Sequence, residues 1–153
     1  MAVEPVIRIQ TAGFDAGAEI AAASRGRANV GAVVSFTGLC RAEEGRLTAL
    51  ELEHYPGMAE AQIGRIAGEA IARWPLLALT VIHRVGRIEA GDDIVLVVAA
   101  ATHRQAAFDA ASFVMDFLKS EAPFWKKEHR RDGADGGWVE ARHADEEALL
   151  RWR

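Results

Sequence analysis

The chain has 153 residues, half of them hydrophobic, and carries a formal net charge of −4. The length predicts one domain over 1–153 with a sizeable core. The acidic balance argues against nucleic acid or a membrane as a partner. The sequence shows neither a bilayer-spanning apolar run nor a signal-peptide pattern, and its only cysteine, Cys40, excludes an internal disulfide. We therefore expect a cytoplasmic protein.

The first part of the chain is predicted to form a strand, a helix and a second strand. Alternating apolar residues predict a short strand over 6–9. Asp15 is placed to cap a helix over 16–24. β-branched residues over 31–37 predict a buried strand that ends at Gly38.

A polar loop over 39–46 is followed by a strand and an amphipathic helix. Apolar residues at alternate positions over 49–54 predict a strand with one solvated face. After a turn at 55–57, apolar residues recur at three- and four-residue spacing from Ala59 to Ile71. This spacing predicts a helix that ends near Trp74 and its following proline.

The next segment is predicted to form two strands and the second main helix. Residues 79–84 have strand character, 89–92 form a turn, and the continuously apolar run 94–101 predicts a central strand covered on both faces. A helix then extends to about Ser120, and the spacing of Thr102 and Gln105 predicts a capping box at its start. Its predicted apolar stripe is Phe108, Ala111, Met115 and Leu118, widened by Ala107, Ala110 and Val114.

Beyond Ser120, Pro123 is expected to break the helix and to place Lys126 on the following element. The glycine-rich residues 133–137 predict a loop, 138–140 a short strand, and Asp145 the cap of a last helix. Strands joined by turns, with two main helices, predict an α+β fold with a mixed, largely antiparallel sheet.

Candidate chemistry gathers at both ends of the second main helix. His103 and Arg104 lie at its N-terminus, where exposed N–H groups favour an anion such as phosphate. Lys119 ends the helix and Lys126 follows the proline. A lysine near other cations or apolar rings has a lowered pKa and acts as an acid or base, although Asp116 would oppose that shift by pairing with Lys119. Taken alone, each of these residues is better explained as an ordinary solvated or packed side chain.

The cysteine and the other histidines are expected to have structural roles and not chemical ones. Cys40 is expected to be a small buried hydrophobe rather than a reactive thiol, because nothing else in the chain supplies a base for it. His54 and His83 are expected to be core or rim residues. The histidines lack close ligand spacing, so neither a metal nor another cofactor is expected.

A specific set of motifs occurs in order along the chain. They are Phe36-Thr37-Gly38 followed by Arg41, Glu53-His54-Tyr55-Pro56-Gly57-Met58, Val81-Ile82-His83-Arg84-Val85-Gly86, Gly91-Asp92, His103-Arg104, Met115-Asp116-Phe117-Leu118-Lys119, Ala122-Pro123-Phe124-Trp125-Lys126-Lys127-Glu128 and Trp138-Val139-Glu140-Ala141-Arg142. Together they resemble the MoaE family, the large catalytic subunit of molybdopterin synthase. The resemblance covers roughly residues 30–142, and the block from Lys119 to Lys126 is its most specific part.

The resemblance implies a sulfurtransferase of molybdenum cofactor biosynthesis. Its substrate would be cyclic pyranopterin monophosphate, and a small ubiquitin-like partner would bring sulfur as a C-terminal Gly-Gly thiocarboxylate. The subunit would be a homodimer with one small partner at each end, a heterotetramer. Lys119 and Lys126 would be catalytic. The implied substrate-binding residues are Arg41, His103, Arg104, Lys127, Glu128 and Arg142.

The two groups of candidate residues cannot meet within one chain. His103 and Lys119 lie at opposite ends of one predicted helix, about 24 Å apart at the usual rise per residue. We therefore expect a shared site, with Lys119 and Lys126 from one subunit and His103 and Arg104 from its dimer mate.

Two other functions remain open from the sequence. One is a non-catalytic scaffold that binds a small ubiquitin-like partner. Leu39, where family members commonly carry lysine, argues weakly for this scaffold, and retention of both lysines argues against it. The other is a nucleic-acid binder that uses Lys126, Lys127 and the arginines at 130–131, which fits the acidic net charge poorly.

Overall fold

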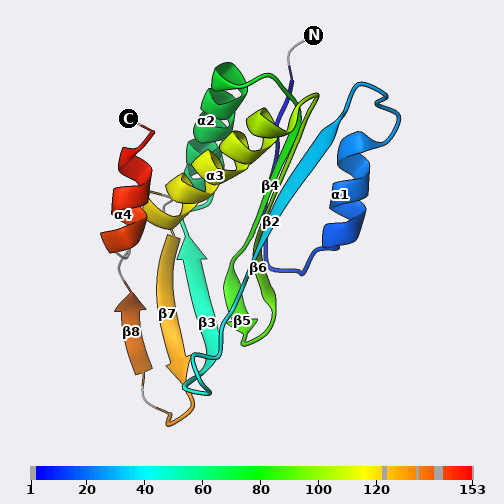
Figure 1. Ribbon diagram of the computed structural model, residues 1–153. Helices are drawn as coiled ribbons and strands as arrows, with labels where there is room; N and C mark the ends of the chain where they lie inside the picture. The colour runs from blue at the N-terminus through cyan, green and yellow to red at the C-terminus, as the bar shows by residue number, and fades with distance from the viewer. Residues whose placement is uncertain (1–2, 122–123, 134, 140–142, 153) are drawn as a thin grey trace.

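The computed structural model describes residues 3–121, 124–133, 135–139 and 143–152. Its strands form two four-stranded sheets, ordered β1-β4-β6-β2 and β5-β3-β7-β8 (Figure 1). In chain order the elements are β1 (Val6–Gln10), α1 (Ala16–Ser24), β2 (Ala32–Leu39), β3 (Leu47–His54), α2 (Met58–Arg73), β4 (Leu76–Arg84), β5 (Gly86–Glu89), β6 (Asp93–Ala101), α3 (Arg104–Ser120), β7 (Phe124–Arg130), β8 (Asp135–Val139) and α4 (His143–Leu150).

The predicted α+β class with largely antiparallel strands is confirmed. Only β1 and β4 pair in parallel among the described strands, and every other pair is antiparallel. The structure has two sheets where one was expected. The chain passes between them from β4 into β5, where Gly86 adopts a positive φ of 83°. Glycine has no Cβ and therefore adopts this backbone conformation at little cost.

Strand β6 is the central strand, as its apolar run predicts. It pairs with β4 on one side and β2 on the other, and residues 95–101 are all buried. Helices α2 and α3 cover one face of this sheet and α1 covers the other (Figure 1). The prediction that Asp15 caps α1 is also confirmed, because its carboxylate accepts a hydrogen bond from Ala18 N at 3.0 Å.

The start of α3 differs from the predicted capping box. The helix begins at Arg104 with His103 as its N-cap, so Gln105 lies too early in the helix to complete the box. Thr102 Oγ1 instead donates to Asn29 O at 3.1 Å, and Gln105 Nε2 donates to Asp109 Oδ1 at 3.0 Å. The threonine therefore links the residues just before α3 to the loop before β2 by a hydrogen bond.

The buried face of α3 is displaced from the predicted stripe. Phe108 is 55 % exposed, whereas Phe113 and Phe117 are buried. The remaining predicted stripe residues are buried as expected. The helix packs on both β6 and α4, and this second contact turns the side bearing Phe113 toward the core.

The C-terminal part contains strands that the sequence pattern did not indicate. β5 and β7 were not expected, and β8 begins at Asp135 inside the predicted loop 133–137. Asp145 lies in the first turn of α4 and is not its cap, because the helix begins at His143. Pro123, the expected helix breaker, lies outside the described residues.

Gly31 permits a close approach between the start of β2 and the turn before α3. A Cβ at this position would lie 2.2 Å from the carbonyl oxygen of Thr102. Gly31→Ala should therefore destabilise the protein by about 2 kcal/mol, as overpacking does elsewhere, measured by urea unfolding. Gly64→Ala is the matched control. A Cβ at position 64, in α2, would lie in open space, so this variant should be more stable to unfolding by about 0.5–1 kcal/mol. Equal effects at the two positions would contradict the close-approach explanation.

The described residues contain neither a membrane-spanning helix nor a cluster of metal-binding side chains. No helix in this part of the chain is long and apolar enough to cross a membrane. Likewise, no group of three or more His, Cys, Asp or Glu side chains among these residues is arranged to hold a metal ion.

Candidate active site

Lys119 and Lys126 lie on different elements that converge where α3 meets the second sheet. Lys119 is exposed in the last turn of α3. Lys126 lies in β7, between Leu52 of β3 and Val139 of β8 in the strand register. Together with Lys127, these are the lysines of the chain, so all of its ammonium side chains lie in this segment.

His83 connects the two lysines electrostatically. Its side chain is only 6 % exposed, near the end of β4, and its Nδ1 lies 2.8 Å from Arg84 O. Burial, together with the nearby charges of Lys126 and Lys119, lowers the pKa of His83 to about 4. The imidazole is therefore neutral at physiological pH. Both lysines lie close enough to the same buried ring to act on its charge.

Phe124 anchors the start of β7 beside this histidine. Its ring stacks on His83 with centroids 4.0 Å apart and planes at 16°, and it makes a tilted contact with His54 at 6.3 Å. Side chains two residues apart on a strand share a face. Phe124 and Lys126 therefore share the face of β7 that contacts His83, so this aromatic contact sets the direction of Lys126.

Strand alternation separates the two neighbouring lysines of β7. Lys127 lies opposite Glu51 of β3, on the face that carries the contact between His129 Nε2 and Glu51 Oε1 at 3.0 Å. Glu128 lies opposite Leu50, on the same face as Lys126. The structure thus groups Glu128 with Lys126 and directs Lys127 to the other side of the sheet.

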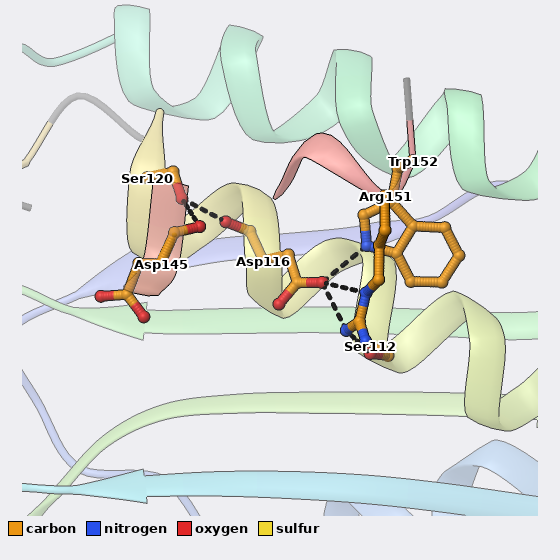
Figure 2. Close-up of polar contacts among 6 residues, drawn as sticks. All are labelled: Ser112, Asp116, Ser120, Asp145, Arg151 and Trp152. Carbon is orange, nitrogen blue, oxygen red and sulfur yellow. Dashed lines mark hydrogen bonds and ion pairs between the residues drawn. The ribbon is translucent and has the colours of Figure 1, made fainter. Parts of the chain in front are cut away.

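The expected pair between Asp116 and Lys119 does not form. Asp116 Oδ2 instead accepts hydrogen bonds from Arg151 and Trp152, which follow α4 (Figure 2). Among the described residues, no carboxylate lies within ion-pair distance of Lys119. The prediction was wrong because the competing partners lie far away in the sequence, where helix spacing does not detect them.

Arg41 is exposed and directly follows Cys40 after β2. Cys40 is the buried hydrophobe that we expected, 2 % exposed, and burial raises the pKa of its thiol. It packs with Leu52, which lies opposite Lys126. Backbone hydrogen bonds to Gly91 and Asp92 hold Cys40 in place and thereby position the base of the arginine.

The remaining candidates are not brought to Lys119 within this chain. His103 and Arg104 are exposed at the far end of α3, which is continuous over Arg104–Ser120. The separation of about 24 Å that helical rise predicts therefore holds for this structure. Arg142 lies outside the described residues. The candidate residues therefore do not form one cluster within the chain, because His103 and Arg104 lie at the start of α3 and Lys119 lies at its end.

Comparison with known proteins identifies the family. A family model described as "MoaE protein" matches residues 9–121, which include Arg41, His103, Arg104 and Lys119. The chain belongs to the MoaE family. A relative from Mesorhizobium japonicum named "Molybdopterin synthase catalytic subunit" is 69 % identical over 149 residues, covering 97 % of this chain and 94 % of its own.

Solved MoaE-family structures share the fold. The "Molybdopterin biosynthesis MoaE protein" from Burkholderia ambifaria matches with a TM-score of 0.82 and 49 % identity, covering 97 % of each chain. Molybdopterin synthase from Staphylococcus aureus matches with a TM-score of 0.76 and 30 % identity, covering 86 % of this chain and 95 % of its own. The family resemblance inferred from the sequence motifs is confirmed.

The sequence motifs contained His83 and His54, but their relation to the lysines was not apparent. We expected them to be core or rim residues, and the burial of His83 confirms this for that residue. Their contact with Phe124 adds a role in placing β7. The sequence did offer one indication of this contact: His54, His83 and Phe124 each belong to a different motif of the MoaE-type set.

Proposed function

We propose that this chain is the catalytic subunit of a molybdopterin synthase. It transfers sulfur from the C-terminal Gly-Gly thiocarboxylate of a small ubiquitin-like subunit to cyclic pyranopterin monophosphate, forming the dithiolene of molybdopterin. The close relatives that carry this name support the activity. The observation that carries the proposal is the convergence of Lys119 and Lys126 beside the buried, neutral His83.

The chemistry requires anion binding and proton transfer. Cyclic phosphate and thiocarboxylate are both anions, which lysine and arginine side chains bind by charge-assisted hydrogen bonds. Sulfur transfer to carbon requires protonation of departing oxygen and removal of a proton. We assign the acid–base role to Lys119, whose ammonium lacks a carboxylate partner within the described part of the chain. Lys126 then holds substrate and the end of the thiocarboxylate tail.

The substrate-binding residues follow from the same assignment. Arginine's planar fork suits phosphate, which supports placing Arg41, Arg104 and Arg142 against phosphate and pterin, with His103 beside them. Glu128 shares the Lys126 face of β7, whereas Lys127 would need to act from the opposite face. The protein would work in the cytoplasm as a homodimer, with a small subunit at each end.

Reconstituted turnover tests the proposed function. The chain, the thiocarboxylated small subunit and the cyclic substrate should together form dithiolene product, and Lys119→Ala and Lys126→Ala should be assayed alongside. Absence of product with the unmodified chain, despite normal binding of the small subunit, would support the scaffold alternative. Measuring binding and turnover on the same samples separates these two functions.

Mixed dimers test whether the site is shared between subunits. Lys119→Ala and Arg104→Ala each disable both sites of a homodimer if the two residues act together. A mixed dimer would contain one site with both defects and one with neither, so subunit mixing should restore up to about half of the activity per mixed dimer. Turnover after mixing and re-equilibration is the measurement. Activity no higher than that of either parent would exclude a shared site.

A further inference from the structure

One carboxylate oxygen, Oδ2 of Asp116 in α3, binds the last described residues of the chain through hydrogen bonds. Asp116 Oδ2 accepts from Trp152 Nε1 at 2.6 Å, from Arg151 Nη2 at 2.7 Å and from Arg151 Nε at 3.2 Å. Arg151 Nη2 also donates to Ser112 Oγ at 2.8 Å (Figure 2). We call Asp116, Arg151 and Trp152 the carboxylate latch. The Asp116 side chain within it is only 16 % exposed.

The latch donors are held by their own packing. The Trp152 ring makes edge contacts with Trp74 and Phe113, each with centroids 5.6 Å apart. The Arg151 guanidinium lies 5.0 Å from the Trp152 ring centre. Aromatic and cation–π contacts of this kind add to the burial energy of the ring. The indole N–H therefore points at Asp116 from a fixed position.

A second contact joins α4 to α3 beside Lys119. Ser120 Oγ lies 2.9 Å from Asp116 O and 2.8 Å from Asp145 O, so its single proton is shared between two backbone carbonyls (Figure 2). The latch and this serine lie on either side of the turn that carries Lys119. The packing of α4 on α3 therefore fixes the two α3 residues, Asp116 and Ser120, that lie on either side of Lys119 in the sequence.

The latch occupies the carboxylate that would otherwise pair with Lys119. Residues three apart on a helix are neighbours, so Asp116 is within reach of the lysine when its other partners leave. The elements around the end of α3 carry other charged or titratable groups, among them Glu121, Asp145, Glu146 and Glu147 of α4, Lys126 and Glu128 of β7, His83 of β4 and His54 of β3. Asp116 differs from these groups because it lies on the same helix as Lys119, one turn before it.

We propose that the segment that follows α4, acting through Arg151 and Trp152, withholds the Asp116 carboxylate from Lys119 and so keeps this lysine available for proton transfer with the substrate. The inference rests on the proposed function, in which Lys119 transfers protons. Arg151 and Trp152 are positioning residues here, because they act on Lys119 through Asp116 and need not touch the substrate.

Titration of the lysines tests the proposal without requiring turnover. Reductive methylation with ¹³C-formaldehyde labels Lys119, Lys126 and Lys127, and the Lys119→Arg variant assigns the first signal by NMR. In the double variant Arg151→Ala/Trp152→Phe, released Asp116 should pair with Lys119. The titration midpoint of the Lys119 signal should then rise by about half a pH unit, as expected for an exposed ion pair.

Asp116→Asn distinguishes carboxylate release from simple loss of α4 packing. Added to the double variant, it should return the Lys119 midpoint to its original value, because the asparagine carries no charge. Alone, it should leave that midpoint in place. Arg151→Lys, which keeps a charged donor, should give a smaller rise than the double variant. An unchanged midpoint in the double variant, or a rise that persists with Asp116→Asn, would overturn the latch proposal.

Turnover on unmethylated protein separates this proposal from the proposed function. At a fixed pH well below the midpoint, a half-unit rise should lower the deprotonated fraction of Lys119, and with it the rate of proton abstraction, about threefold. Asp116→Asn should restore this rate in the latch-broken background. If the midpoint moves as expected but the unmodified chain forms no product, the proposed function fails and the latch stands. If the chain is active and the midpoint does not move, the latch fails and the proposed function stands.

Discussion

Lys119→Ala is expected to lower dithiolene formation by about 10²- to 10⁴-fold, the range in which a positioned acid or base contributes to a rate. The side chain is exposed at the end of α3, so its loss should leave folding nearly unchanged. Binding of the small subunit should persist, because one exposed side chain rarely dominates an interface. Single-turnover kinetics with saturating small subunit is the appropriate measurement, since it isolates the chemical steps from association.

Lys119→Arg tests which property of the side chain matters. Arginine keeps the positive charge but does not release a proton at physiological pH, so the variant should remain nearly as inactive as Lys119→Ala. Arg25→Ala is a suitable control, because it removes an exposed cation at the end of α1, on the opposite face of the first sheet (Figure 1). Full activity in Lys119→Arg would show that charge alone is required and would refute the acid–base role.

The stability of the protein should depend on pH through His83. The folded pKa of about 4 lies below the ordinary value of 6.5, mainly because the ring is buried. Between these pH values the unfolded chain binds a proton that the folded chain excludes, so stability falls as pH falls from 6.5 toward 4. At about 1.4 kcal/mol per pKa unit, the total loss from this residue is about 3 kcal/mol. Above pH 6.5 the contribution is complete and no longer changes.

Urea unfolding between pH 4.5 and 7.5 measures this dependence. His83→Gln should remove most of the slope that His83 contributes, although the variant will be less stable at neutral pH because the ring contact with Phe124 is lost. His103→Gln is the matched control, since its ring lies at the exposed start of α3 and is not enclosed by folding. A slope that is the same in His83→Gln and the unmodified chain would contradict the assignment of the pH dependence to this buried ring.

Lys119 and His83, the residues of these two predictions, belong to one group of neighbouring side chains. The neutral His83 ring supports Phe124, and Phe124 sets the face of β7 from which Lys126 extends. Protonation of His83 would place a third positive charge beside Lys119 and Lys126. The same acidification that destabilises the fold should therefore also disturb the lysine pair at the proposed active site.

The sequence alone determined the elements whose pattern is set by one hydrophobic face. The central strand β6, the helices α1 and α2 and the end of α3 all follow from local periodicity and capping. The motifs from Phe36 to Arg142 also identified the family, because their order and residue types are specific. Helical rise was enough to show that His103 and Lys119 lie far apart in one chain.

Only the tertiary structure decided what depends on distant partners. β7 carries a polar or charged side chain at every position from Lys126 to Arg130, which hides any apolar alternation. It is a strand because β3 and β8 supply hydrogen bonds on both sides. Asp116 prefers Arg151 and Trp152 over a lysine one turn away because packing fixes those donors beside it. Local sequence therefore predicts backbone elements well, whereas the partner of a charged side chain is chosen by whichever group the completed fold brings closest.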